Sequence, residues 1–185
     1  MQKDFERRLD DLDDWKDALL GSLAIESPER LAFRPDGKGW CALDVVQHLV
    51  LVEESVVGYA RKKLQGPPQP VPALDRAKLA LLVLILRSPV RFRAPAPVVI
   101  PAETFPLAEL SVRWGKVRED LREILGSLPD ERRRTLLFRH PIGGALDPHY
   151  QLDLNYTQGI RLATRRLGME PCLLYTSDAA DERSS

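Results

Sequence analysis

The chain has three histidines, and these together with nearby acidic residues are the side chains most suited to metal or acid–base chemistry. His48 lies in an apolar run whose valines and leucine recur at helical spacing, at Val45, Leu49, Val52 and Val56. We expect His48 to face the bundle interior beside that stripe. Glu53 and Glu54 follow it by about one helical turn. Two roles are open for His48: a hydrogen-bonded core histidine, or a metal ligand.

The elements that must position His48 are predicted to be helices, which makes the fold class all-α. Four main helices are expected near 3–24, 41–64, 107–126 and 147–168, with a shorter one near 74–87. Ser27-Pro28 and Asp147-Pro148 are typical of helix starts, with a capping side chain before a proline in the first turn. The many prolines between Arg87 and Phe105 predict a long irregular crossover.

Composition places the chain among ordinary globular domains and argues against two kinds of partner. With 185 residues and 44% hydrophobic residues, it is long enough for one domain with a real core. The formal net charge is zero, so we expect no nucleic-acid partner. The longest apolar run is too short to span a bilayer, so we expect no membrane partner. Two cysteines form no disulfide framework or zinc-type pair, and we expect a cytoplasmic protein.

The last stretch, residues 172–185, has no periodic apolar face and follows the natural helix stop at Gly168. Its sequence, CLLYTSDAADERSS, resembles the translated library-adapter sequence found at the ends of many metagenomic gene predictions. We therefore expect a non-native, disordered tail and place the domain at residues 1–171. Removing the tail should leave the melting temperature nearly unchanged.

Two stretches carry a resemblance to a known family. Trp40 precedes the apolar run that ends in His48-Leu49, and Glu53 follows it; residues 138–146 read FRHPIGGAL. Together they resemble the first metal-ligand helix and the loop before the last helix of the DinB/YfiT-like superfamily. The resemblance covers roughly residues 1–168. It implies a bacterial protein with an up-down four-helix bundle, a long crossover and an extra short helix.

The resemblance also implies a divalent metal held by three histidines, one at His48 and two on the last helix four residues apart. Those two positions fall at about Gln158 and Leu162 here, and neither is a histidine. The resemblance gives His140 a structural role, and His149 lies more than one turn too early. A site of His48 and Gln158, with Glu53 or water, would bind zinc or nickel weakly or not at all.

Two functions follow from the resemblance. The first is a binding or stress-response protein with a degenerate divalent-metal site. The alternative is a metal-dependent thiol transferase, or a related hydrolase-like enzyme, in which the metal activates a small-molecule thiol for attack on an electrophile. A homodimer is compatible with either function. The missing histidines favour the first function for this chain.

Overall fold

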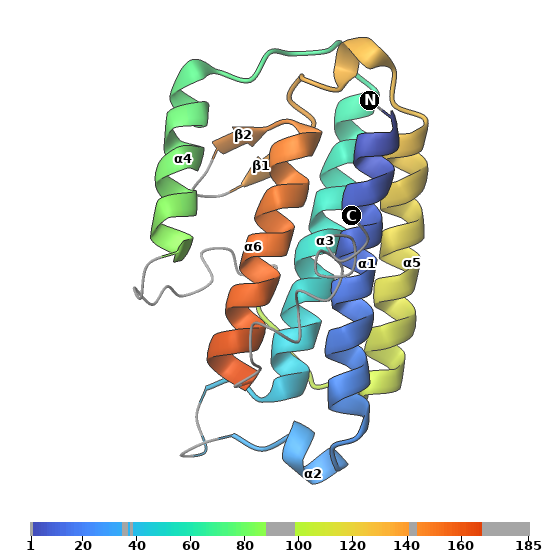
Figure 1. Cartoon of the computed structure of the whole chain (residues 1–185), viewed down its shortest axis with the longest axis vertical. Coiled ribbons are helices and arrows are strands. Elements are labelled where there is room, and N and C mark those ends of the chain that lie inside the picture. Colours follow the sequence, from blue (N-terminus) through green and yellow to red (C-terminus); the bar gives the residue numbers. More distant parts are fainter. Residues whose placement is uncertain (1, 35–36, 38, 88–98, 141–143, 168–185) are drawn as a thin grey trace, which may run out of the picture.

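The computed structural model describes residues 2–34, 37, 39–87, 99–140 and 144–167, with side chains at all of these positions except 2–4, 83–87, 156, 158, 160–162 and 164–166. The described chain is mostly helical (Figure 1). Its elements are α1 Gln2–Ala24, α2 Pro28–Leu31, α3 Ala42–Leu64, α4 Ala73–Arg87, α5 Leu107–Gly126, the 3₁₀ turn η3 Asp130–Arg132, β1 Phe138–His140, β2 Gly144–Leu146 and α6 Pro148–Leu167. The five predicted helices are therefore confirmed, each within a residue of its expected ends.

Helices α1, α3, α5 and α6 form the bundle. In the described residues α3 packs on α5 and α6, and α1 packs on the same two helices, so α1 and α3 lie on one diagonal. Figure 1 shows α1 and α6 running toward the end where α2 lies, and α3 and α5 running away from it. Strict up-down alternation does not hold between α3 and α5, because α4 runs back along the bundle between them.

The predicted helix starts at Ser27 and Asp147 are confirmed by their hydrogen bonds. The Ser27 hydroxyl accepts a hydrogen bond from the backbone amide of Arg30, and Pro28 opens α2. The Asp147 carboxylate accepts one from the amide of Tyr150, three residues into the next helix. Both side chains satisfy a backbone donor that the first helical turn leaves without a partner.

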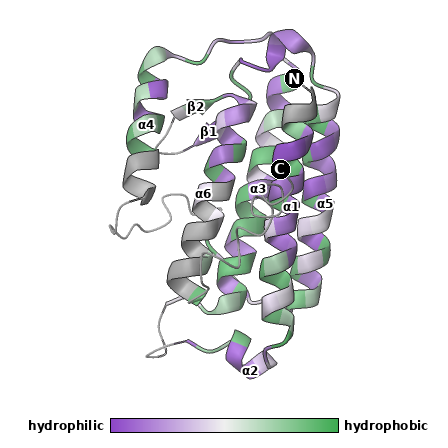
Figure 2. Ribbon diagram, viewed as in Figure 1, coloured by the Kyte–Doolittle hydropathy of each residue, from purple (hydrophilic) through white to green (hydrophobic). Residues whose placement is uncertain are grey.

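A buried ionic layer divides the core into two apolar clusters. Arg118 of α5 and Glu53 of α3 are both almost fully buried, and their side chains meet in a two-pronged contact of 2.6 and 2.8 Å. Asp13 of α1 lies 3.6 Å from the same guanidinium. One apolar cluster includes Leu12 and Val56, and the other includes Trp15, Val45, Leu49, Val50 and Trp114. Figure 2 shows the mixture of hydrophilic and hydrophobic residues along α1 and α5 that makes this layering possible.

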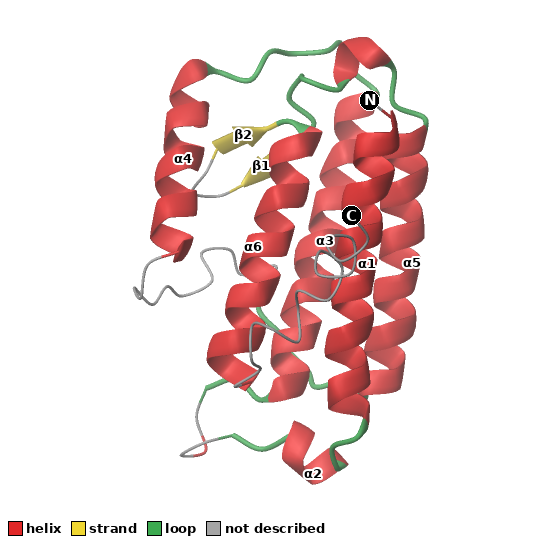
Figure 3. Ribbon diagram, in the orientation of Figure 1, coloured by secondary structure: helices red, strands yellow, loops and turns green. Residues whose placement is uncertain are grey.

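The segment around His140 is a small antiparallel hairpin and not the loop that we expected. Phe138 pairs with Leu146 and His140 with Gly144 (Figure 3). Gly144 has a φ of +75°, and a Cβ there would lie 2.5 Å from the carboxyl carbon of Asp75 in α4. The same carboxylate accepts a hydrogen bond of 2.9 Å from the Ala145 amide. The hairpin thus depends on a helix about 70 residues earlier in the chain, which sequence spacing does not reveal.

Helix α4 is an outer layer. It packs on β2 and α6, with Leu79 and Leu82 buried in the first apolar cluster, while Leu74 and Leu81 are exposed. The predicted tail, residues 172–185, lies outside the described residues, and so does most of the predicted irregular crossover. None of the described helices combines the length and apolar character needed to cross a membrane.

Candidate functional site around His48

His48 lies in the second turn of α3, at the edge of the bundle and not in its centre. It shares a helix face with half-buried Leu51 and exposed Ser55, whereas fully buried Val46 and Val50 lie on the opposite side of α3. The expectation that His48 faces the bundle interior is therefore met only in part, because its side chain is half-buried. That expectation assumed that Val52 belongs to the buried stripe of α3, but Val52 is only half-buried.

Two groups hold the imidazole of His48 from outside the helix. Its Nδ1 lies 2.6 Å from the backbone carbonyl oxygen of Val99, which follows the crossover. The ring of Trp40 packs against the imidazole, with ring centroids 4.8 Å apart. Since a carbonyl can only accept a hydrogen bond, Nδ1 must carry the proton of the neutral ring, and the lone pair is then on Nε2.

The hydrogen bond at Nδ1 leaves Nε2 as the nitrogen with a lone pair for a ligand or a proton. Metal-bound histidines commonly donate their second ring N–H to a carbonyl or carboxylate, which fixes the tautomer and the ring orientation. Burial lowers the pKa of His48 below its ordinary value of 6.5, and the hydrogen bond to Val99 offsets only part of that shift. The ring is therefore neutral at neutral pH, which is the form that binds a metal.

The entry to α3 is fixed by a charged capping arrangement. The Asp44 carboxylate accepts a hydrogen bond of 2.8 Å from the Cys41 amide and pairs with the Arg34 guanidinium. Arg34 also donates to the carbonyl of Gly39, 2.6 Å away. Burial raises the pKa of the Cys41 thiol, which is therefore protonated at neutral pH and a poor nucleophile. These contacts position the turn that carries Trp40 toward His48.

Glu53 and Glu54 are both committed to arginines of α5. Glu53 is paired with Arg118 in the ionic layer, and Glu54 accepts hydrogen bonds from Arg113 at 3.0 and 3.1 Å. Five residues separate His48 from Glu53, which turns their side chains about 140° apart around a helix with 3.6 residues per turn. Glu53 therefore does not join His48, and the expectation that it could complete a site there is wrong.

Gln158, the second predicted ligand position, lies within α6, which packs on α3. Its side chain is outside the described residues, so the pairing of His48 with Gln158 stays a prediction. Asn155 lies about one turn before Gln158, and buried Gln151, one turn earlier still, donates a 2.7 Å hydrogen bond to it. Asn155 Nδ2 makes no hydrogen bond to any described residue. The spacing of Gln151, Asn155 and Gln158 places all three positions along one side of α6.

The other two histidines lie away from His48. His140 is in β1, which packs on α3 beside the first apolar cluster, and burial lowers its pKa to about 4. His149 is the second residue of α6, and its ring packs on that of Phe5 with centroids 4.4 Å apart. Strand β1 and the start of α6 lie toward the end of the bundle opposite the start of α3 (Figure 1).

Sequence reasoning missed two groups, one beside His48 and one beside the hairpin. Val99 contributes a backbone carbonyl, which no side-chain pattern could reveal, and Asp75 is an ordinary acidic residue near a helix start. Within the described ranges, no group of three His, Cys, Asp or Glu side chains is placed to hold a metal ion.

Comparisons with protein-family models, curated proteins and solved structures each gave no match to the chain.

Proposed function

We propose that this chain is a DinB/YfiT-like bundle protein that acts by binding, in a stress-response setting, and that it carries a degenerate divalent-metal site at His48 and Gln158. One observation carries the proposal. The chain has three histidines, and β1 with His140 and the start of α6 with His149 lie toward the other end of the bundle from the start of α3, which carries His48. No set of three imidazoles can therefore form around His48, so tight binding of zinc or nickel is not expected.

The alternative is a metal-dependent thiol transferase, or a related hydrolase-like enzyme, acting on a small-molecule thiol and an electrophile. The geometry of His48 supports this alternative, because its Nδ1 is hydrogen-bonded to the Val99 carbonyl and burial lowers the pKa of the ring. When bound, the metal would lower the pKa of the thiol. His48 would supply one neutral imidazole, and Val99 would orient it.

Metal binding by the purified protein distinguishes the two functions. We expect the wild type to bind Zn²⁺ and Ni²⁺ weakly in calorimetry and to gain little in melting temperature from either ion. The double variant Gln158→His/Leu162→His should bind at least tenfold more tightly, because it would restore imidazoles four residues apart on one helix face. Adding His48→Ala to this variant should remove most of the gain.

A matched control is His149→Ala in the same double variant, which removes a histidine from the other end of the bundle and should leave metal affinity unchanged. If the wild type instead purifies with one metal per chain that only His48→Ala releases, the degenerate site is disproved and the transferase becomes the leading function.

A further inference from the structure

Helix α4 presents an apolar face to solvent. Leu74 and Leu81 are 67% and 57% exposed. The alanines that share this face are exposed as well: Ala73, Ala77 and Ala80. The opposite side of α4 is the one that packs, because Leu79 and Leu82 are buried and Asp75 binds the hairpin. Figure 1 shows α4 as an outer helix, with α6 and the hairpin on its inner side.

Basic residues border this face on both sides. With 3.6 residues per turn, Arg76 and Lys78 lie about 100° to either side of the centre of the exposed face. Both are exposed; Lys78 is paired with Asp75, and Arg76 makes no ion pair with any described residue. Long basic side chains can lay their apolar stems along such a face while their charges extend beyond it. The outer side of α4 therefore joins an apolar face to positive borders.

Further cations surround the start of α4. The segment 61–78 is joined to the segment 130–139, because Arg132 donates to the Gly66 carbonyl at 2.6 Å and the Leu136 amide donates to the Gln69 carbonyl at 2.7 Å. Figure 1 shows the end of α3, the start of α4 and η3 at the same end of the bundle. Six basic residues of these two segments make no ion pair with any described residue: Lys62, Lys63, Arg76, Arg132, Arg134 and Arg139.

The carboxylates of the same two segments do not balance these charges. Asp75 is paired with Lys78, and Asp130 with Arg133, so both are already neutralised. Glu131 is the one carboxylate there that has no cation partner among the described residues. We call the six unpaired cations the basic end of the bundle. Although the whole chain has no net charge, this end has a positive excess.

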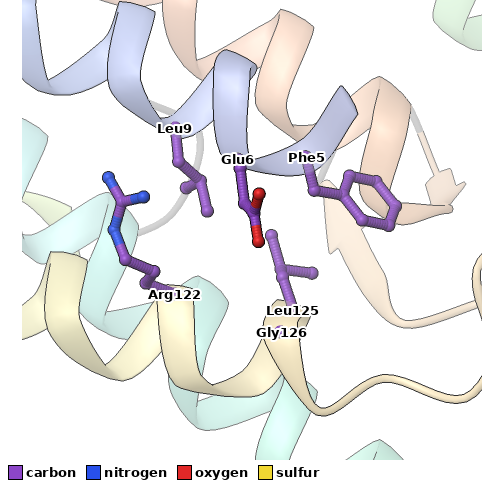
Figure 4. Close-up of a pocket in the computed structure, with 6 residues that line it drawn as sticks. All are labelled: Phe5, Glu6, Leu9, Arg122, Leu125 and Gly126. Atoms are coloured by element: carbon purple, nitrogen blue, oxygen red, sulfur yellow. The ribbon is translucent and has the colours of Figure 1, made fainter. Parts of the chain in front are cut away.

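The side of the bundle formed by α1 and α5 differs in both respects. The apolar residues that line the small pocket there are at most 2% exposed (Figure 4). Arg122, the cation beside them, is paired with Asp10 and Asp13. This pocket therefore offers neither an exposed apolar surface nor an unpaired cation, whereas α4 and the basic end offer both.

We propose that α4 and the basic end bind the surface of a membrane that contains anionic lipids. Leu74 and Leu81 enter the boundary between headgroups and acyl chains, and the cations contact the headgroup phosphates. Clusters of about four to eight cations on or beside an amphipathic helix are typical of such binding. The leucines favour a membrane over a nucleic acid, because a phosphate backbone binds cations and leaves leucines in water.

Binding at a membrane surface needs no spanning helix. The expectation of no membrane partner came from the length of the longest apolar run, which concerns spanning alone. The proposed surface also lies at the opposite end of the bundle from the start of α3, which carries His48 (Figure 1). It therefore does not depend on the proposed metal site.

Sedimentation of the full chain with vesicles tests this proposal. One set of vesicles contains phosphatidylcholine alone, and the other contains equal parts of phosphatidylcholine and phosphatidylserine. We expect saturable binding to the mixed vesicles and little binding to the neutral ones. Added salt should weaken the binding, because it screens the attraction between the cations and the lipid surface.

Two double variants separate the apolar and the charged contributions. Leu74→Ser/Leu81→Ser should weaken binding to the mixed vesicles at least about tenfold, because burying half of a leucine side chain contributes about 1 kcal/mol. Arg76→Gln/Arg139→Gln should weaken it roughly fivefold per cation removed, since each cation near an anionic surface contributes about 1 kcal/mol. The matched controls lie on α5: Val112→Ser and Lys116→Gln change side chains that are 75% and 69% exposed and should leave binding unchanged.

Circular dichroism establishes that each variant is folded before its binding is compared. No binding to the mixed vesicles, equal binding to both compositions, or an equal loss in the α5 controls would each overturn the proposal. Titration with a duplex oligonucleotide covers the other polyanion. If the chain binds the duplex more tightly than the mixed vesicles, and the leucine variant keeps all of its binding to both, the basic end is a nucleic-acid surface and the membrane proposal is disproved.

Discussion

Removing one partner of the buried Arg118–Glu53 pair should destabilise the bundle more than removing both. The two side chains are 3% and 5% exposed, and Nε and Oε2 lie 2.6 Å apart without the geometry of a hydrogen bond. A second contact of 2.8 Å has that geometry. Each single replacement, Glu53→Leu or Arg118→Met, leaves a buried charge without its main partner, which costs about 3–5 kcal/mol.

The double variant should recover much of this loss. It replaces both charges by apolar side chains in a layer that already adjoins two apolar clusters, and Asp13 keeps its 2.8 Å contact with Arg122. For the double variant to cost less than either single variant, the two positions must be coupled by more than the cost of one replacement, about 3–5 kcal/mol. A chain of this size changes its melting temperature by about 2–4 °C per kcal/mol, so each single variant should melt about 6–20 °C below the wild type.

Urea unfolding at pH 7, followed by circular dichroism and tryptophan fluorescence, measures the four free energies of this cycle. Arg113 and Glu54 provide the matched control, because they join the same two helices but are 30% and 36% exposed. Removing either should cost about 0–1 kcal/mol. If the effects of Glu53→Leu and Arg118→Met simply add, or if each costs less than the exposed control, the assignment of a buried ionic layer is refuted.

Three further predictions concern packing, pH and the tail. Gly159→Ala would place a Cβ 2.5 Å from the indole of Trp15 and should lower the free energy of unfolding by about 1–3 kcal/mol in urea. Gly115→Ala is the control: a Cβ there meets nothing within 4 Å, so this variant should be neutral or stabilising in the same assay. The Ala145 amide of the hairpin, and then Lys78, lower the pKa of Asp75 below its ordinary value of 3.8. The stability that this carboxylate adds to the fold is therefore fully present above pH 3.8 and is lost as the pH falls through the lowered pKa. The stability difference between wild type and Asp75→Asn should therefore vanish on acidification; a difference that persists at the lowest pH would contradict this role. Deleting residues 172–185 should leave the melting temperature within about a degree in calorimetry, and a loss of several degrees would show that the tail belongs to the fold.

The main helices could be predicted because their signals are local. Periodic apolar residues define α1, α3 and α5, and a capping side chain followed by proline marks the starts of α2 and α6. Such signals depend on residues within a few positions of each other, so one sequence contains them in full. The same patterns predicted that His48 lies on a helix beside apolar residues. They did not predict how far its side chain is buried.

Tertiary structure alone decided which distant groups meet. The sequence gives no sign that Glu53 turns to Arg118 on another helix, or that the Val99 carbonyl reaches His48 across 51 positions. Periodicity identifies the apolar face of a helix, but it cannot identify the segments that pack along the borders of that face. His48 lies at such a border of α3. The hairpin was missed for the same reason: the carboxylate that holds it comes from α4, and three-residue strands carry too little pattern to be recognised without that partner.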